Sequence, residues 1–86
     1  MKFLTLNTHS WMEENPQQKF EDLLKDILAK QYDVICFQEI NQTIESPVVP
    51  VNDLYHPTPS AEPIHQDHYV RCLVEKLEEE GLSYHW

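Results

Sequence analysis

The chain has no apolar run long enough to cross a membrane and few of the basic residues that neutralise nucleic-acid phosphates. Its longest unbroken apolar run is residues 34–37, far short of the roughly 20 residues that a membrane-spanning helix needs. Six Lys and Arg stand against fifteen Asp and Glu, for a formal net charge of −9. That balance argues against non-specific nucleic-acid binding by this segment. Residues 1–7 turn polar too soon for a signal peptide, so we expect a cytoplasmic protein.

Cysteine is also scarce. Two cysteines cannot build a disulfide framework or a four-thiolate zinc site. Cys36 lies in an apolar run and Cys72 in a helical pattern, so we expect both to be buried, reduced thiols. With 86 residues and an ordinary hydrophobic fraction of 41%, the chain fits at most one small domain with a marginal core.

Residue patterns in the first half predict a strand, a helix and a second strand. Residues 2–9 are mostly apolar or β-prone, as is typical of a strand. Asn15 and Pro16 suit the start of a helix, with Asn15 as its N-cap, and apolar residues then recur at helical spacing over residues 16–30. Residues 33–38 predict the next strand, because the continuous apolar run at residues 34–37 suits a strand covered on both faces. We therefore expect two parallel strands joined by a crossover helix, in an α/β fold.

The second half begins with a long loop. Residues 41–64 hold five of the six prolines and show no periodicity, and loops of this length are usually functional or mobile. Residues 66–80 predict a second helix, with Gly81 as its C-terminal cap. Residues 82–86 resemble the opening of a third strand. We interpret residues 1–86 as the N-terminal portion of one α/β domain.

Two polar residues follow the predicted strands. Asn7 and Glu39 come at, or just past, the carboxyl ends of their strands. In parallel neighbours these ends meet at one edge of the sheet, where open α/β sheets bind ligands. A carboxylate beside an amide suits Mg²⁺, which takes oxygen ligands and keeps several waters. Alone, an Asn there is usually a turn former and a Glu is usually solvated, so the metal hypothesis depends on the wider pattern.

That wider pattern is a strand ending in Leu-Asn-Thr-His at residues 6–9, a crossover helix, and Asp-Val-Ile-Cys-Phe-Gln-Glu at residues 33–39. It resembles the start of the endonuclease/exonuclease/phosphatase superfamily, which includes deoxyribonuclease I, abasic-site endonucleases, neutral sphingomyelinases and inositol polyphosphate 5-phosphatases. The resemblance implies a partial deoxyribonuclease I-like α/β sandwich. It also implies that Glu39 binds the catalytic Mg²⁺ (or Mn²⁺) and that Asn7 orients the scissile phosphate or a metal-bound water.

The same resemblance implies a hydrolase that acts on a phosphate ester. It leaves open whether the substrate is a nucleic acid, a phospholipid head group or a small phosphoester. The superfamily's catalytic His, its Asp-x-Asn segment and its Ser-Asp-His segment would lie beyond Trp86. We therefore expect this chain alone to be inactive.

Other polar residues have simpler interpretations. We expect Gln38 to be a structural hydrogen-bonding residue and His9 to cap a strand end rather than to reach substrate. His56, His65 and His68 match no standard zinc spacing, and we expect His65 and His68 to be solvated.

Two alternative functions remain open at this point. One is a His-rich metal-binding fragment, and the other is a short interaction module that pairs through an exposed sheet edge. Unpaired strand edges and uncovered apolar faces also predict that the chain self-associates.

Overall fold

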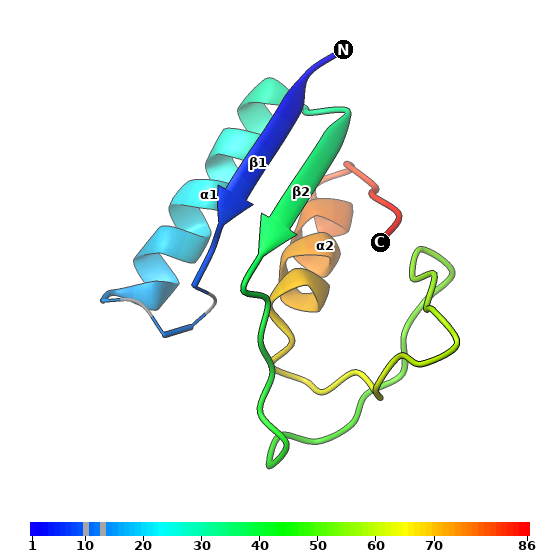
Figure 1. The fold of residues 1–86 in the computed structure, drawn as a ribbon. Helices are drawn as coiled ribbons and strands as arrows, with labels where there is room; N and C mark the ends of the chain where they lie inside the picture. Colours follow the sequence, from blue (N-terminus) through cyan, green and yellow to red (C-terminus); the bar gives the residue numbers. More distant parts are fainter. Residues whose placement is uncertain (10, 13) are drawn as a thin grey trace. The chain divides into compact units, whose positions relative to one another are not determined.

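The computed structural model describes residues 1–9, 11–12 and 14–86. The chain divides into two compact units, Met1–Asn41 and Gln42–Trp86. None of the helices in these described stretches is long and apolar enough to cross a membrane. In chain order the elements are β1 (Phe3–Asn7), α1 (Pro16–Lys30), β2 (Val34–Gln38) and α2 (Tyr69–Glu79) (Figure 1).

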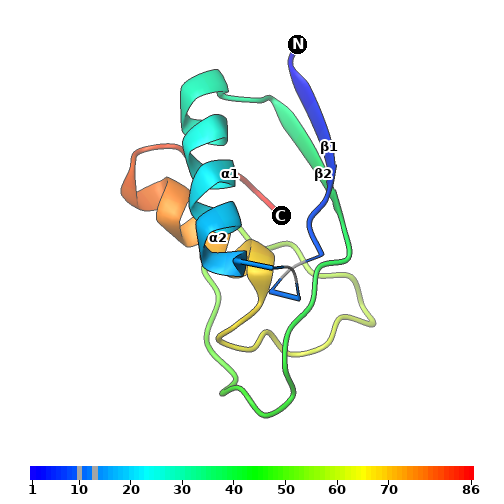
Figure 2. The ribbon, with the colours of Figure 1, turned by 90° about the vertical axis from the view of Figure 1, so that its left-hand side faces the viewer.

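The first unit is the predicted strand, helix and strand. Strands β1 and β2 pair in parallel, with Phe3 opposite Val34 and Asn7 opposite Gln38. Parallel neighbours need a long crossover between them, and α1 makes it, running back beside the strands (Figures 1 and 2). The apolar stripe of α1 is its buried side, formed by Phe20, Leu24 and Ile27. The α/β prediction is confirmed.

Helix α1 begins at Pro16, as predicted, but Asn15 does not cap it with its side chain. Asn15 has a left-handed backbone, with φ 53°, and its side chain makes no capping hydrogen bond. A capping side chain needs an extended backbone that aims its oxygen at the first helical N–H groups. Here the main-chain oxygen of Asn15 accepts a hydrogen bond from the N–H of Lys19 instead, at 3.2 Å.

The two strands are covered on one face only. Burial alternates along each strand, so one face is half-buried while the other, with Phe3, Val34 and Cys36, is exposed. Phe3 is 65% exposed. The predictions of a two-sided buried strand and of a buried Cys36 are therefore wrong. Register explains this, because Cys36 lies opposite Thr5 on the exposed face and a strand's side chains alternate between faces.

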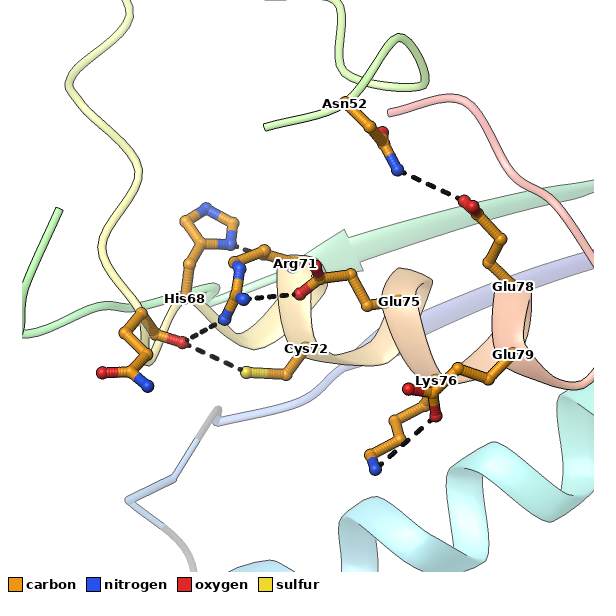
Figure 3. Close-up of polar contacts among 9 residues, drawn as sticks. Asn52, His68, Arg71, Cys72, Glu75, Lys76, Glu78 and Glu79 are labelled. Carbon is orange, nitrogen blue, oxygen red and sulfur yellow. Dashed lines mark hydrogen bonds and ion pairs between the residues drawn. The ribbon is translucent and has the colours of Figure 1, made fainter. Parts of the chain in front are cut away.

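In the second unit, α2 begins at Tyr69, three residues later than expected, because His68 is its N-cap. The His68 ring nitrogen accepts the Arg71 backbone N–H at 3.3 Å. The carbonyl of Gln66 lies outside the helix and accepts from the Arg71 guanidinium at 2.7 Å and from the Cys72 thiol at 3.4 Å (Figure 3).

The C-terminus of α2 has the cap that the sequence predicts. Gly81 has φ 89°, a conformation that glycine adopts without steric cost. Its N–H bonds to the carbonyl of Glu78 at 3.0 Å, and the N–H of Leu82 bonds to the carbonyl of Leu77 at 2.9 Å. This pair of bonds is the Schellman motif.

Residues 82–86, where the third strand was expected to open, form no strand. Trp86 bonds to the main chain of the loop. The Trp86 N–H bonds to the carbonyl of Leu54 at 2.8 Å, and the His56 N–H bonds to the carbonyl of Trp86 at 2.6 Å. The rings of Tyr55 and Trp86 lie 4.4 Å apart. A strand needs a partner along its length, and here the loop supplies one at a single residue.

The predicted loop is confirmed, since residues 41–64 hold no helix or extended strand pair. Side-chain hydrogen bonds join the residues near the two ends of this loop. Gln42 donates to the carbonyl of Pro63 at 2.9 Å and accepts from the His65 N–H at 2.6 Å. Thr43 donates through its N–H and hydroxyl to the carboxylate of Asp67.

Candidate functional site

The two residues singled out by the sequence lie at one edge of the sheet. Asn7 is the last residue of β1 and is paired with Gln38, the last residue of β2. Glu39 follows directly, and the side chains of Asn7 and Glu39 are exposed. Both strands end at the same side of the sheet in Figure 1. The parallel register therefore brings the amide and the carboxylate to neighbouring strand ends.

His9 contacts both of these residues. Its backbone N–H donates to Oδ1 of Asn7 at 3.2 Å, and its ring Nδ1 lies 2.6 Å from Oε2 of Glu39. The two side chains of the latter pair are about half exposed, at 50% and 52%. An ion pair this exposed contributes about 0–1 kcal/mol to stability. The expectation that His9 merely caps a strand end is incomplete, because its ring reaches the candidate metal ligand.

Thr8 was not singled out by the sequence, yet it joins the two strand ends. It is 5% exposed, the one buried polar residue in the part of the chain that the structure describes. Its N–H donates to the carbonyl of Gln38 at 3.2 Å. Its hydroxyl lies 3.3 Å from that same carbonyl and 3.4 Å from the carbonyl of Glu39. Strand alternation could have found it, since Thr8 points inward between two outward neighbours.

Both strand ends leave the sheet through left-handed backbone. His9 has φ 54° and Glu39 has φ 57°. This conformation costs an L-residue about 1–2 kcal/mol, because Cβ approaches the following carbonyl oxygen. Such strain persists where surrounding contacts hold it, and it concentrates at functional sites. We call Asn7, Thr8, His9 and Glu39 the strand-end cluster.

The donor chemistry of the strand-end cluster fits Mg²⁺. The Glu39 carboxylate is a hard oxygen ligand, and Mg²⁺ in proteins is often held by one or two carboxylates and several waters. Across the described residues, no three His, Cys, Asp or Glu side chains gather closely enough to hold a metal ion. Such a gathering is what a zinc site requires, so the cluster fits a sparsely ligated hard cation better than zinc.

The other histidines have structural partners in the second unit. His65 bonds through Nδ1 to the carbonyl of Ser46 at 2.5 Å, and His68 caps α2. His56 and His85 bond to each other at 2.7 Å, Nε2 to Nδ1. The prediction that His65 and His68 are simply solvated is therefore wrong. Burial lowers the pKa of His68 below its ordinary value, which favours the neutral ring that its capping bond requires.

A solved structure resembles the chain in sequence and in fold. It is an endonuclease/exonuclease/phosphatase family protein from Leptotrichia buccalis C-1013-b, with 37% sequence identity and a TM-score of 0.71. The resemblance to the endonuclease/exonuclease/phosphatase superfamily is confirmed. The match covers 92% of this chain and 26% of that protein, so the chain spans about a quarter of its length. No protein-family model matches the chain, and neither does any curated protein.

The likeness to the endonuclease/exonuclease/phosphatase family extends over both units, since 92% of the chain is matched. At 37% identity the similarity is one of sequence as well as of fold. The mixed α/β architecture expected from the sequence agrees with it.

Proposed function

We propose that this chain supplies the Mg²⁺-binding strand-end site of a metal-dependent phosphoesterase of the endonuclease/exonuclease/phosphatase type. The observation that carries the proposal is the placement of Asn7 and Glu39 at adjacent carboxyl ends of parallel strands. The family likeness adds support. The substrate is a phosphate ester of a nucleic acid, a phospholipid head group or a small molecule. Mn²⁺ is the alternative ion, because it accepts the same oxygen ligands.

Each residue has a chemical role in this proposal. Glu39 supplies the anionic oxygen that binds the metal. The Oδ1 atom of Asn7 already accepts the His9 N–H, so its Nδ2 group is the donor that can hold a phosphate oxygen. A bound Mg²⁺ would polarise the phosphoryl oxygen and neutralise charge that develops on it.

We also propose that this chain by itself does not turn over substrate. Hydrolysis of a phosphate ester needs an activated water and several groups that stabilise the transferring phosphoryl group. The strand-end cluster offers one carboxylate and one amide for this work, since Thr8 is committed to main-chain bonds and the His9 ring is paired with Glu39. Assays with phosphodiester and phosphomonoester substrates and Mg²⁺ should therefore give background rates.

Metal binding tests the proposal directly. We expect the 86-residue chain to bind Mn²⁺, followed by electron paramagnetic resonance, and Glu39→Gln to weaken that binding at least about tenfold, because an anionic ligand becomes a neutral amide. Glu14→Gln is the matched control: it removes an exposed carboxylate from the same unit and should leave binding unchanged. Equal affinity of wild type and Glu39→Gln would refute the assignment of Glu39.

A further inference from the structure

The contact between His9 and Glu39 indicates that His9 does more than end the strand. A histidine that only terminated a strand would need no carboxylate partner, yet Nδ1 lies 2.6 Å from Oε2 of Glu39. Such a short distance is typical of a hydrogen bond to a charged oxygen. Both residues reach each other from left-handed backbone, at φ 54° and φ 57°. The contact is therefore made by two residues that each carry backbone strain.

The surroundings hold this contact in place. The backbone of His9 is tied to Oδ1 of Asn7, and the preceding Thr8 is tied to the carbonyls of Gln38 and Glu39. Hydrogen bonds therefore hold the main chain at the positions from which the His9 ring and the Glu39 carboxylate extend. The side-chain torsions of Glu39 can still rotate. If metal binding alone had to fix these torsions, the lost conformational entropy would weaken the binding.

We propose that His9 is a positioning residue for the metal ligand Glu39, an inference that rests on the proposed function. The ring N–H at Nδ1 donates to Oε2, and this bond holds the carboxylate in an orientation in which it would bind the metal. Metal-binding carboxylates are commonly held by such outer hydrogen bonds, and loss of an outer partner typically weakens metal binding by 10–100-fold. His9 itself does not bind the metal, since Mg²⁺ prefers oxygen ligands.

Two substitutions separate positioning from a structural effect. His9→Gly removes the ring, and His9→Asn retains a donor, because the Asn Nδ2 group can replace Nδ1 at the start of the side chain. Gly and Asn both tolerate the left-handed backbone of this position. Neither variant therefore adds strain. His85→Ala is the matched control, because it removes an imidazole from the second unit.

The measurement is Mn²⁺ affinity of the 86-residue chain by electron paramagnetic resonance, with folding checked by circular dichroism. We expect His9→Gly to bind roughly 10–100-fold more weakly and His9→Asn to recover most of that loss. His85→Ala should bind as the wild type does. Activity plays no part in this readout.

The outcomes distinguish this inference from the function on which it rests. If the wild type does not bind Mn²⁺, or if Glu39→Gln binds equally well, the proposed metal site is wrong. If Glu39→Gln weakens binding but His9→Gly binds as the wild type or more tightly, the positioning role alone is wrong. Failure of His9→Asn to recover affinity, or weaker binding by His85→Ala, would also overturn it.

Discussion

Replacing Glu39 by alanine and by glycine separates the cost of its backbone conformation from the role of its carboxylate. Both variants lose the carboxylate and its contact with His9, so their difference reports on the backbone. At φ 57° alanine retains a steric cost of about 1–2 kcal/mol, which glycine avoids. Glycine loses about 0.5–1 kcal/mol through the greater freedom of its unfolded chain. We therefore expect Glu39→Gly to be more stable than Glu39→Ala by about 0.5–1 kcal/mol.

Urea unfolding followed by circular dichroism measures this difference, and Gln38 provides its control. Gln38 precedes Glu39 as the last residue of β2 and is likewise exposed. In ordinary strand backbone the order should reverse, with Gln38→Gly less stable than Gln38→Ala by about 0.5–1 kcal/mol. If alanine is the more stable residue at both positions, Glu39 carries no strain and the backbone argument fails.

Two further predictions concern pH and association. Burial lowers the pKa of His68 below its ordinary value of 6.5; Asp67 opposes this effect, and Arg71 acts in the same direction as burial. The unfolded chain therefore takes up the proton first as pH falls, and the contribution of His68 to stability, present above about pH 6.5, is lost below it. In thermal melts, the advantage of the wild type over His68→Asn, which caps without titrating, should shrink with acidification; a constant difference would contradict this. Phe3 and Val34 form an exposed apolar face, 65% and 40% exposed, and burying such a face releases about 25 cal/mol per Å². Sedimentation equilibrium at low micromolar concentration should show self-association that Phe3→Lys weakens, and a monomeric wild type would refute it.

Local signals predicted most of the fold. Helix α1 has the predicted bounds, because a proline at its first position and an apolar stripe each act within a few residues. The C-terminal cap of α2 at Gly81 was predictable for the same reason, since a Schellman motif involves only neighbours in sequence. The pairing of β1 with β2 followed from their apolar runs and the helix between them. These features depend on short-range chemistry that a sequence displays.

The features that were missed depend on partners elsewhere in the chain. Cys36 is exposed because its face of the sheet is uncovered, and an apolar run does not show how many of its faces will be covered. Residues 82–86 have strand-like composition but form no strand, although Trp86 bonds to the main chain of the loop. Asn15 is a residue type that commonly caps helices, yet its backbone is left-handed and its side chain makes no capping hydrogen bond. In each case the local sequence was compatible with the predicted structure, but the contacts or backbone conformation that the structure requires are not present.

The strand-end cluster was predictable in part. Asn7 and Glu39 were placed correctly at one edge of the sheet, because parallel register follows from strand order. Their link through His9 was not predictable, since it depends on left-handed backbone at His9 and Glu39. Thr8 was missed because a threonine at a strand end can be solvent-exposed or buried and hydrogen-bonded, and the sequence does not show which.

The order of residues at the end of β1 explains how so short a segment can build a site. Asn7 and His9 are exposed, whereas Thr8 between them is buried. Thr8 is bonded to the carbonyls of Gln38 and Glu39, which fixes the spacing of the two strand ends. The His9 ring contacts Glu39, and the Asn7 side chain accepts the His9 N–H. A turn that served only to end the strand would be more stable with glycine or asparagine at the left-handed positions. A glutamate at φ 57°, facing a histidine at φ 54°, supports the proposal that its carboxylate is needed at that edge.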